Sequence, residues 1–167
     1  DIQTIGFRDV GFWYKPQEVV IKALDLEIRP RETIALVGPT GGGKSTIASL
    51  LCRFYEPCRG QILLNGVDYR QRSLQWYQST LGIVLQHPHL FSGSVAANIA
   101  YGHPEATAAQ IEAAARQVQA HEFISRMDRG YHTAVGEGGG LLSVGQRQLI
   151  ALARAVLADP QVFVMDE

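Results

Sequence analysis

The stretch from Thr33 to Leu51, TIALVGPTGGGKSTIASLL, constrains the fold of this chain more than any other. Residues 33–37 are an apolar run with a β-branched bias, too short for a helix, and they predict a buried parallel strand. Residues 38–45, GPTGGGKS, then fit the pattern of a glycine, four residues and Gly-Lys-Ser. Residues 46–51 continue with apolar side chains at helical spacing. The stretch therefore predicts a strand, a phosphate-binding loop and a helix, in that order.

The composition of this loop suits a triphosphate. Bare backbone at Gly41, Gly42 and Gly43 can turn successive N–H groups inward around phosphate oxygens, which side chains would block. A helix that begins near Gly43 adds the positive end of its dipole. Lys44 would place an ammonium on the β- and γ-phosphates, and the Ser45 hydroxyl is short enough to ligate Mg²⁺. The alternative is a glycine-rich turn before an ordinary amphipathic helix.

Composition narrows the class of protein. With 46% hydrophobic and 19% charged residues among 167, the chain is expected to form one globular, soluble domain. The formal net charge of -1 argues against a general nucleic-acid-binding surface. No apolar run approaches the roughly 18 residues that cross a bilayer, and the first residues do not resemble a signal peptide.

The cysteines and histidines give no metal or disulfide pattern. Cys52 and Cys58 are too few for a disulfide framework or a zinc site, which favours a reduced, intracellular setting. His87 and His89 flank a proline without a third ligand in the sequence, so a solvated loop is favoured over a metal site.

Both ends of the sequence suggest a fragment. The chain starts without an initiator methionine and stops at Glu167, directly after an apolar strand. A parallel strand at the very end of a sheet would leave pairing groups exposed.

The region before the loop predicts an antiparallel layer. Residues 4–14 alternate with Val10, Phe12 and Tyr14 on one face, and residues 19–28 form a second alternating run. Tyr14 lies where strand becomes turn and could stack on a flat base, an interaction of about 1–3 kcal/mol. By itself, a lone tyrosine is better explained by core packing.

The region after the loop alternates strands and helices. A strand over 61–66 ends in an Asn-Gly turn, and a short helix is expected over 73–79. A buried strand over 81–85 then delivers Gln86 at its end. Strand ends face the ligand in open α/β sheets, so this amide could reach a metal or an attacking water. A glutamine alone is more often an ordinary loop residue.

From Ser94 onward the chain becomes helical. Helices are expected over 107–118, with Thr107 as N-cap, and over 121–127. This block predicts a helical subdomain, with a solvated hairpin that serves only packing as the alternative. After the glycine-rich residues 136–140, the sequence LSVGQ opens a helix through residue 158, with Ser143 as N-cap and a second potential phosphate site.

The last predicted strand, residues 162–165, ends in two acids. Asp166 could hold Mg²⁺ through water, and Glu167 could orient or deprotonate the attacking water. The alternative is a buried strand that leaves the core through two solvated acids. The two acids alone leave both interpretations open.

Together these stretches resemble the nucleotide-binding domain of the ABC transporter family, along essentially the whole chain. GPTGGGKST resembles its Walker A motif, Tyr14 its base-stacking aromatic residue and Gln86 its Q-loop glutamine. LSVGQ resembles the signature motif, the most specific of these, and VFVMDE resembles Walker B with the catalytic glutamate. LFSGSV at residues 90–95, Asn98-Ile99 and Gly136-Glu137 are similar to the exporter branch.

The resemblance implies an α/β fold, a P-loop NTPase with a mostly parallel core sheet, an N-terminal antiparallel β layer and an α-helical subdomain. Residues 1–167 would form a single ATP-binding domain, incomplete at its C-terminus. About 1–90 and 155–167 would be the core and β subdomain, and 91–154 the helical subdomain with the signature.

The resemblance also assigns site residues, with ATP and Mg²⁺ as cofactors. It implies catalytic roles for Glu167, Gln86 and Lys44, and metal ligation by Ser45, Gln86 and Asp166. The nucleotide contacts that it implies are Tyr14, Gly38, Pro39, Thr40, Gly41, Gly42, Gly43, Lys44, Ser45, Thr46, Ser143, Gly145 and Gln146.

The partners implied are a second nucleotide-binding domain, in a homo- or heterodimer, and the transmembrane domains of an exporter at the cytoplasmic face of a membrane. Ser143 and Gly145 of one domain would close head to tail over the γ-phosphate at Lys44 of the other. Hydrolysis would follow this closure, and the motion would pass through the region around Gln86 to the membrane-spanning partners and drive translocation. No nucleic acid partner is expected.

Two other functions are alternatives to the exporter. A soluble ABC-type ATPase that acts on nucleic acid or ribosomes is disfavoured by the near-neutral charge and by the LFSGSV segment. A non-hydrolytic regulatory nucleotide-binding module is disfavoured by Glu167.

Three residues depart from the family pattern. Val144 replaces the first glycine of the usual LSGGQ, while Leu149 and Gly138 stand where arginines are common. The D-loop and switch histidine that should follow Glu167 are absent from the sequence. The 167-residue piece is therefore expected to bind nucleotide weakly and to hydrolyse it poorly or not at all.

Overall fold

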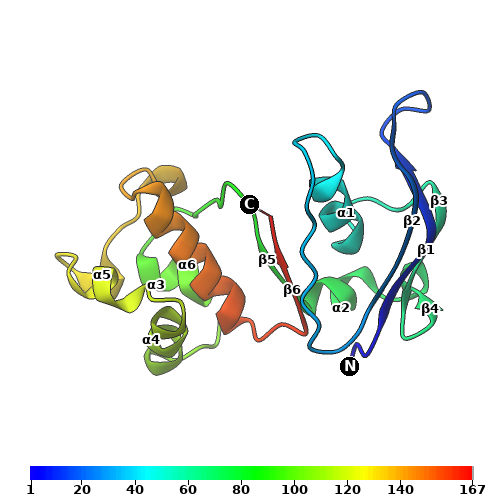
Figure 1. Ribbon diagram of the computed structural model, residues 1–167. Helices are drawn as coiled ribbons and strands as arrows, with labels where there is room; N and C mark the ends of the chain where they lie inside the picture. The colour runs from blue at the N-terminus through cyan, green and yellow to red at the C-terminus, as the bar shows by residue number, and fades with distance from the viewer. Residues whose placement is uncertain (167) are drawn as a thin grey trace. The chain divides into compact units, whose positions relative to one another are not determined.

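The computed structural model describes residues 1–166 and contains two compact units, Asp1–Leu81 and Gly82–Glu167 (Figure 1). Each unit has its own sheet and helices.

The first unit is built on a four-stranded antiparallel sheet in the order β2-β1-β3-β4. Its strands are β1 (Ile5–Trp13), β2 (Val19–Ile28), β3 (Arg59–Leu64) and β4 (Val67–Asp68). In β1, Ile5, Phe7, Val10 and Phe12 are buried, because bulges along the strand return apolar side chains to the core face. The predicted antiparallel layer is confirmed.

The turn between β3 and β4 has the expected chemistry. Asn65 and Gly66 both adopt positive φ, 52° and 79° respectively. A two-residue hairpin turn of the primed type needs this conformation at both positions, and Asn-Gly supplies it with little strain. The Asn65 side chain also accepts hydrogen bonds from the backbone N–H groups of Gln3 and Thr4. The turn therefore ties the N-terminal segment to the sheet.

Three helices complete the first unit. They are α1 (Lys44–Leu51), the 3₁₀ helix η1 (Tyr69–Gln71) and α2 (Leu74–Ser79). The helices predicted after the glycine loop and at residues 73–79 are confirmed. Ser73 caps α2, since its hydroxyl accepts a hydrogen bond from the Trp76 N–H.

The buried strand predicted over residues 33–37 is wrong for this structure. These residues lie outside every described strand, and the exposed fractions of Ile34, Leu36 and Val37 are 39%, 39% and 89%. The sheet of the same unit is wholly antiparallel, so it offers no parallel neighbour to this segment. An apolar, β-branched run becomes a strand only where a partner takes up its backbone hydrogen bonds.

The second unit contains a two-stranded parallel sheet of β5 (Leu81–Val84) and β6 (Val162–Met165). Both strands were predicted at nearly these positions. Gly82 is needed where the chain packs closely, because a Cβ there would lie 2.6 Å from Pro160 Cγ. Beyond β6, the Asp166 N–H donates to the Val84 carbonyl at 2.9 Å, so pairing continues to the ends of both strands.

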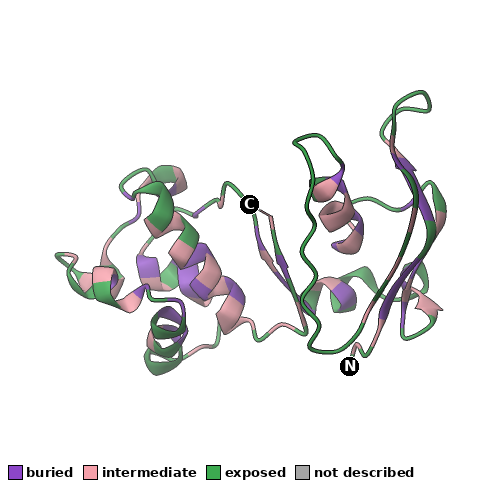
Figure 2. Cartoon of the chain, viewed as in Figure 1, coloured by how far each residue is buried: buried purple, intermediate pink, exposed green. Residues whose placement is uncertain are grey.

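The rest of the second unit is helical and has a core of its own (Figure 2). Ile99, Ile111, Ile124 and Ile150 are buried together, one from each α-helix. The elements are α3 (Val95–Ala100), α4 (Ala108–Gln117), α5 (His121–Ser125), η2 (Gly130–His132), η3 (Glu137–Gly139) and α6 (Val144–Leu157). The helices expected after Ser94 are confirmed.

A capping box fixes the start of α4. The Thr107 hydroxyl accepts from the Gln110 N–H at 3.3 Å, and the Gln110 side chain accepts from the Thr107 N–H at 2.8 Å. We expect Thr107→Ala to lower the free energy of unfolding by about 1 kcal/mol in a urea titration. Thr107→Asn can still cap the helix, so its free energy of unfolding should remain close to that of the wild-type protein. Equal stability of the alanine and asparagine variants would contradict this role.

Candidate functional site

The glycine loop between residues 38 and 43 has a backbone that few other residues could adopt. Gly41 and Gly43 have φ of 80° and 85°. The Gly42 N–H donates to the Pro39 carbonyl at 3.0 Å, and a Cβ on Gly42 would lie 2.9 Å from that oxygen. Around Gly41 a Cβ would meet nothing within 4 Å. The loop thus presents bare main chain beside open space, as phosphate binding requires.

Lys44 bends back over this loop. Its Nζ donates to the carbonyls of Gly38 at 2.8 Å and Pro39 at 2.9 Å. Helix α1 begins at the same lysine, and its N-cap, Gly43, has no side chain to cap the first turn. The ammonium and the positive end of the helix dipole therefore lie together at the loop.

Tyr14 lies against the same helix. Its hydroxyl is 3.3 Å from Thr46 Oγ1, yet the residue is 53% exposed. The ring makes near-perpendicular contacts with Phe12 and Tyr55, at centroid distances of 4.9 and 5.3 Å. Core packing, the simpler interpretation of a lone tyrosine, does not describe a ring this exposed. The structure brings Tyr14 to the first turns of α1 with about half of its surface exposed.

The remaining predicted contacts of this unit follow the loop into the helix. Gly43 and Thr46 are buried and Lys44 is half-buried. The exposed members are Gly38, Pro39, Thr40, Gly41, Gly42 and Ser45.

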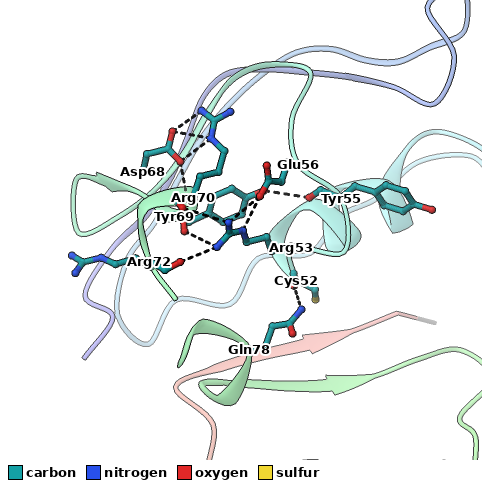
Figure 3. Close-up of polar contacts among 9 residues, drawn as sticks. All are labelled: Cys52, Arg53, Tyr55, Glu56, Asp68, Tyr69, Arg70, Arg72 and Gln78. Atoms are coloured by element: carbon teal, nitrogen blue, oxygen red, sulfur yellow. Dashed lines mark hydrogen bonds and ion pairs between the residues drawn. The ribbon is translucent and has the colours of Figure 1, made fainter. Parts of the chain in front are cut away.

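The far end of α1 is anchored by side chains that the sequence interpretation missed (Figure 3). The Tyr77 hydroxyl donates to the Leu51 carbonyl at 2.6 Å, and Gln78 Nε2 donates to the Cys52 carbonyl at 3.2 Å. Both are main-chain groups that a helix end leaves without partners. Burial raises the pKa of Tyr77, so the hydroxyl keeps its proton and remains a donor.

Arg53 adds a second anchor directly after α1 (Figure 3). Its guanidinium donates to the carbonyls of Tyr69 and Arg72, each at 3.0 Å, and pairs with Glu56 at 2.9 Å. The phosphate-loop helix is therefore fixed at the end opposite its loop. No local spacing signals this network, because Arg53 is separated from its carbonyl partners by 16 and 19 residues.

In the second unit, Gln86 and Asp166 follow neighbouring strands. The hydrogen bond from Asp166 N–H to the Val84 carbonyl aligns the ends of β5 and β6. Gln86 comes two residues after Val84 and is exposed, while Asp166 is half-buried. The structure thus brings an amide and a carboxylate to one edge of the sheet. The predicted catalytic Glu167 lies outside the described residues.

The LSVGQ segment forms the start of α6. Ser143 is the N-cap as predicted: its hydroxyl accepts from the Gln146 N–H at 3.2 Å, and Gln146 Oε1 accepts from the Ser143 N–H at 2.9 Å. A Cβ on Gly145 would meet nothing within 4 Å, and Val144 is 56% exposed. The valine therefore fits without a clash within this unit. Leu149, which stands where an arginine is common, packs against the helical core.

No helix among residues 1–166 is long and apolar enough to cross a membrane. Within the same residues, no three histidine, cysteine, aspartate or glutamate side chains are grouped as metal ligands would be.

Together, the glycine loop, its lysine and the helix that it opens define a P-loop nucleotide-binding domain with a helical subdomain. The family profile described as "ABC transporter" matches residues 21–167. This chain therefore belongs to the ABC transporter family.

Relatives from distant organisms align over almost the whole chain. ABC transporter B family member 3 of Dictyostelium discoideum is 48% identical over 98% of this chain and 12% of its own length. A fatty acid ABC transporter ATP-binding/permease protein of Mycobacterium bovis is 47% identical over 98% of this chain and 26% of its own. The chain thus spans between about an eighth and a quarter of these relatives.

A solved structure has the same fold. The structure of a bacterial Atm1-family ABC exporter with ATP bound covers 100% of this chain and 29% of its own, with a TM-score of 0.96 and 39% sequence identity. The antiparallel layer, the parallel strands and the helical subdomain are thus the ABC-type ATPase architecture.

Proposed function

We propose that this chain binds and hydrolyses ATP and thereby powers substrate translocation by a membrane ABC exporter. The observation that carries the proposal is the position of the Lys44 ammonium, held over a glycine loop at the start of the helix that the exposed Tyr14 contacts through Thr46. One group suits phosphates and the other a flat base. The similarity to an exporter with ATP bound supports the same conclusion.

The residues of the site also suit Mg²⁺. Ser45, Gln86 and Asp166 offer hydroxyl, amide and carboxylate oxygens, the hard ligands that this ion prefers. They are the residues that would hold it, together with phosphate oxygens. When bound, the ion would neutralise charge that develops on the phosphates.

The chain's own groups would act on the nucleotide as follows. Lys44 exchanges its carbonyl partners, Gly38 and Pro39, for the β- and γ-phosphates. Tyr14 stacks on the base. Glu167 would orient or deprotonate the attacking water, and the Gln86 amide would reach the metal or that water.

Ser143 can serve two roles through one hydroxyl. As N-cap its oxygen accepts from the Gln146 N–H, which leaves its own O–H as a donor. In a head-to-tail pair of domains, that O–H and the bare backbone at Gly145 would meet the γ-phosphate at Lys44 of the partner copy. The open space around Gly145 and the exposure of Val144 favour such an approach. The motion of this closure would be transmitted to transmembrane partners at the cytoplasmic face of the membrane.

The proposal is tested by Glu167→Gln in the full-length protein. We expect the steady rate of ATP hydrolysis to fall at least about 100-fold, because the water loses its base, while ATP binding is retained. Glu105→Gln changes an exposed carboxylate and should leave the rate unchanged. Hydrolysis that survives Glu167→Gln, or an unchanged protein that binds no ATP, would contradict the proposed function.

A further inference from the structure

Three aromatic rings gather beside the phosphate-loop helix: Phe12 and Tyr14 from the end of β1, and Tyr55 from the segment after α1. The centroid of the Tyr14 ring lies 5.3 Å from that of Tyr55 and 4.9 Å from that of Phe12, with interplanar angles of 88° and 89°. Phe12 and Tyr55 also contact each other, at 5.6 Å. Each ring therefore touches the other two.

We propose that Tyr55 is a positioning residue, which orients the ring of Tyr14 for stacking on the nucleotide base. The inference rests on the proposed function, since it assumes that Tyr14 receives a base. Tyr55 acts through Tyr14 and has no part in holding the phosphates.

Tyr14 depends on ring neighbours on two sides, Phe12 and Tyr55, because about half of its own surface is exposed. It lies beyond the last residue of β1 and is 53% exposed, and its hydroxyl lies 3.3 Å from Thr46 Oγ1. Perpendicular neighbours oppose rotation of the ring, because turning it would drive its edges into them. A ring that is already oriented loses less conformational freedom when a base stacks on it.

Tyr55 can provide this support because its own backbone is anchored. Its carbonyl accepts from the Tyr69 hydroxyl at 3.3 Å (Figure 3). Tyr69 is fully buried, and the Arg53 guanidinium lies over its ring at 5.3 Å. Burial raises the pKa of Tyr69, so the hydroxyl stays protonated and keeps donating. The anchor at the far end of α1 thus continues through Tyr55 to Tyr14.

Because Tyr55 is partly exposed, its side chain can be changed to test positioning of Tyr14 without disrupting the core. The residue is 47% exposed, whereas Phe12 is 4% exposed and belongs to the core. Truncating Tyr55 therefore removes a ring contact with Tyr14 and leaves the buried sheet in place. Since Tyr69 bonds the backbone carbonyl of residue 55, that anchor also survives a change of side chain.

The test compares a ligand that has a base with one that lacks it. Dissociation constants of the full-length protein are measured by calorimetry, with Mg²⁺ present, for ATP and for inorganic tripolyphosphate. We expect Tyr55→Ala and Tyr55→Leu to weaken ATP binding about three- to tenfold and to leave tripolyphosphate binding unchanged. Tyr55→Phe keeps the ring and should bind ATP as the unchanged protein does.

A double variant completes the test. In the Tyr14→Ala background, Tyr55→Ala should cause no further loss of ATP affinity, because the ring that it orients is already gone. Equal weakening of both ligands, unchanged ATP affinity, or losses that add in the double variant would each overturn the inference and leave the proposed function standing. Absence of ATP binding by the unchanged protein would instead overturn both.

Discussion

Replacing Lys44 by alanine is expected to weaken ATP binding by about 10- to 100-fold. Charge-assisted hydrogen bonds to an anion contribute about 1.5–3 kcal/mol, and the ammonium is positioned directly over the loop. In this structure the same ammonium donates to the carbonyls of Gly38 and Pro39. Both residues are exposed, so water can replace the lysine there at small cost to folding. Calorimetric titration with ATP measures the change.

A matched control separates this local effect from net charge. Lys15→Ala removes an equally charged side chain from an exposed turn and should leave ATP affinity unchanged. Lys44→Arg keeps the charge with a different shape, so its ATP affinity should fall between those of Lys15→Ala and Lys44→Ala. If Lys15→Ala and Lys44→Ala weaken binding equally, the lysine acts only through net charge, and its assignment to the phosphates is wrong.

Asn98→Ala is expected to lower the free energy of unfolding by about 3 kcal/mol. Asn98 is 2% exposed and bonds both main-chain groups of Phe91: Oδ1 accepts from the N–H and Nδ2 donates to the carbonyl, each at 2.8 Å. Nδ2 also donates to the Ser94 carbonyl at 3.0 Å. Alanine would leave the part-buried N–H and carbonyl of Phe91 without these side-chain partners, which costs more than the bonds themselves contribute.

Arg154 extends the network that Asn98 begins. Its guanidinium donates to Asn98 Oδ1 at 2.9 Å and to the Asn98 carbonyl at 2.8 Å, and it lies over the rings of Phe91 and Tyr101. The network therefore joins α6 to the segment after Gln86 within the second unit.

Urea denaturation measures the loss of unfolding free energy in Asn98→Ala. Gln148→Ala, on the exposed face of α6, is the matched amide control and should change stability by less than about 0.5 kcal/mol. Asn98→Asp preserves the shape but not the donors and should also destabilise. Equal stability of the Asn98 and Gln148 variants would show that the network does not hold the helices together.

Features with a local signal in the sequence were predicted well. The N-caps at Thr107 and Ser143, the Asn65-Gly66 turn and the helix that follows the glycine loop all depend on residues within a few positions of one another. Their backbone geometry is fixed by short-range hydrogen bonds and allowed φ values, so one sequence is enough to locate them.

Features that depend on distant partners were predicted poorly. The run over 33–37 has the composition of a buried strand, but pairing depends on which neighbour is present. The anchor of Arg53 joins residues 16 to 19 positions apart, and Arg154 meets Asn98 across 56 positions. Nothing in the pattern of either residue identifies its partner. The exposure of Tyr14 likewise follows from packing of its neighbours.

The hydrogen bond between Asp166 and Val84 has a geometric consequence. Paired strands lie about 4.8 Å apart, so the sheet sets the spacing of the main chain where the amide and the carboxylate emerge. With the strand ends fixed, the length of each side chain sets how far its polar group lies from the sheet, in steps of one methylene. Gln86→Asn would therefore draw the amide back toward the sheet by one methylene, and Asp166→Glu would extend the carboxylate by one.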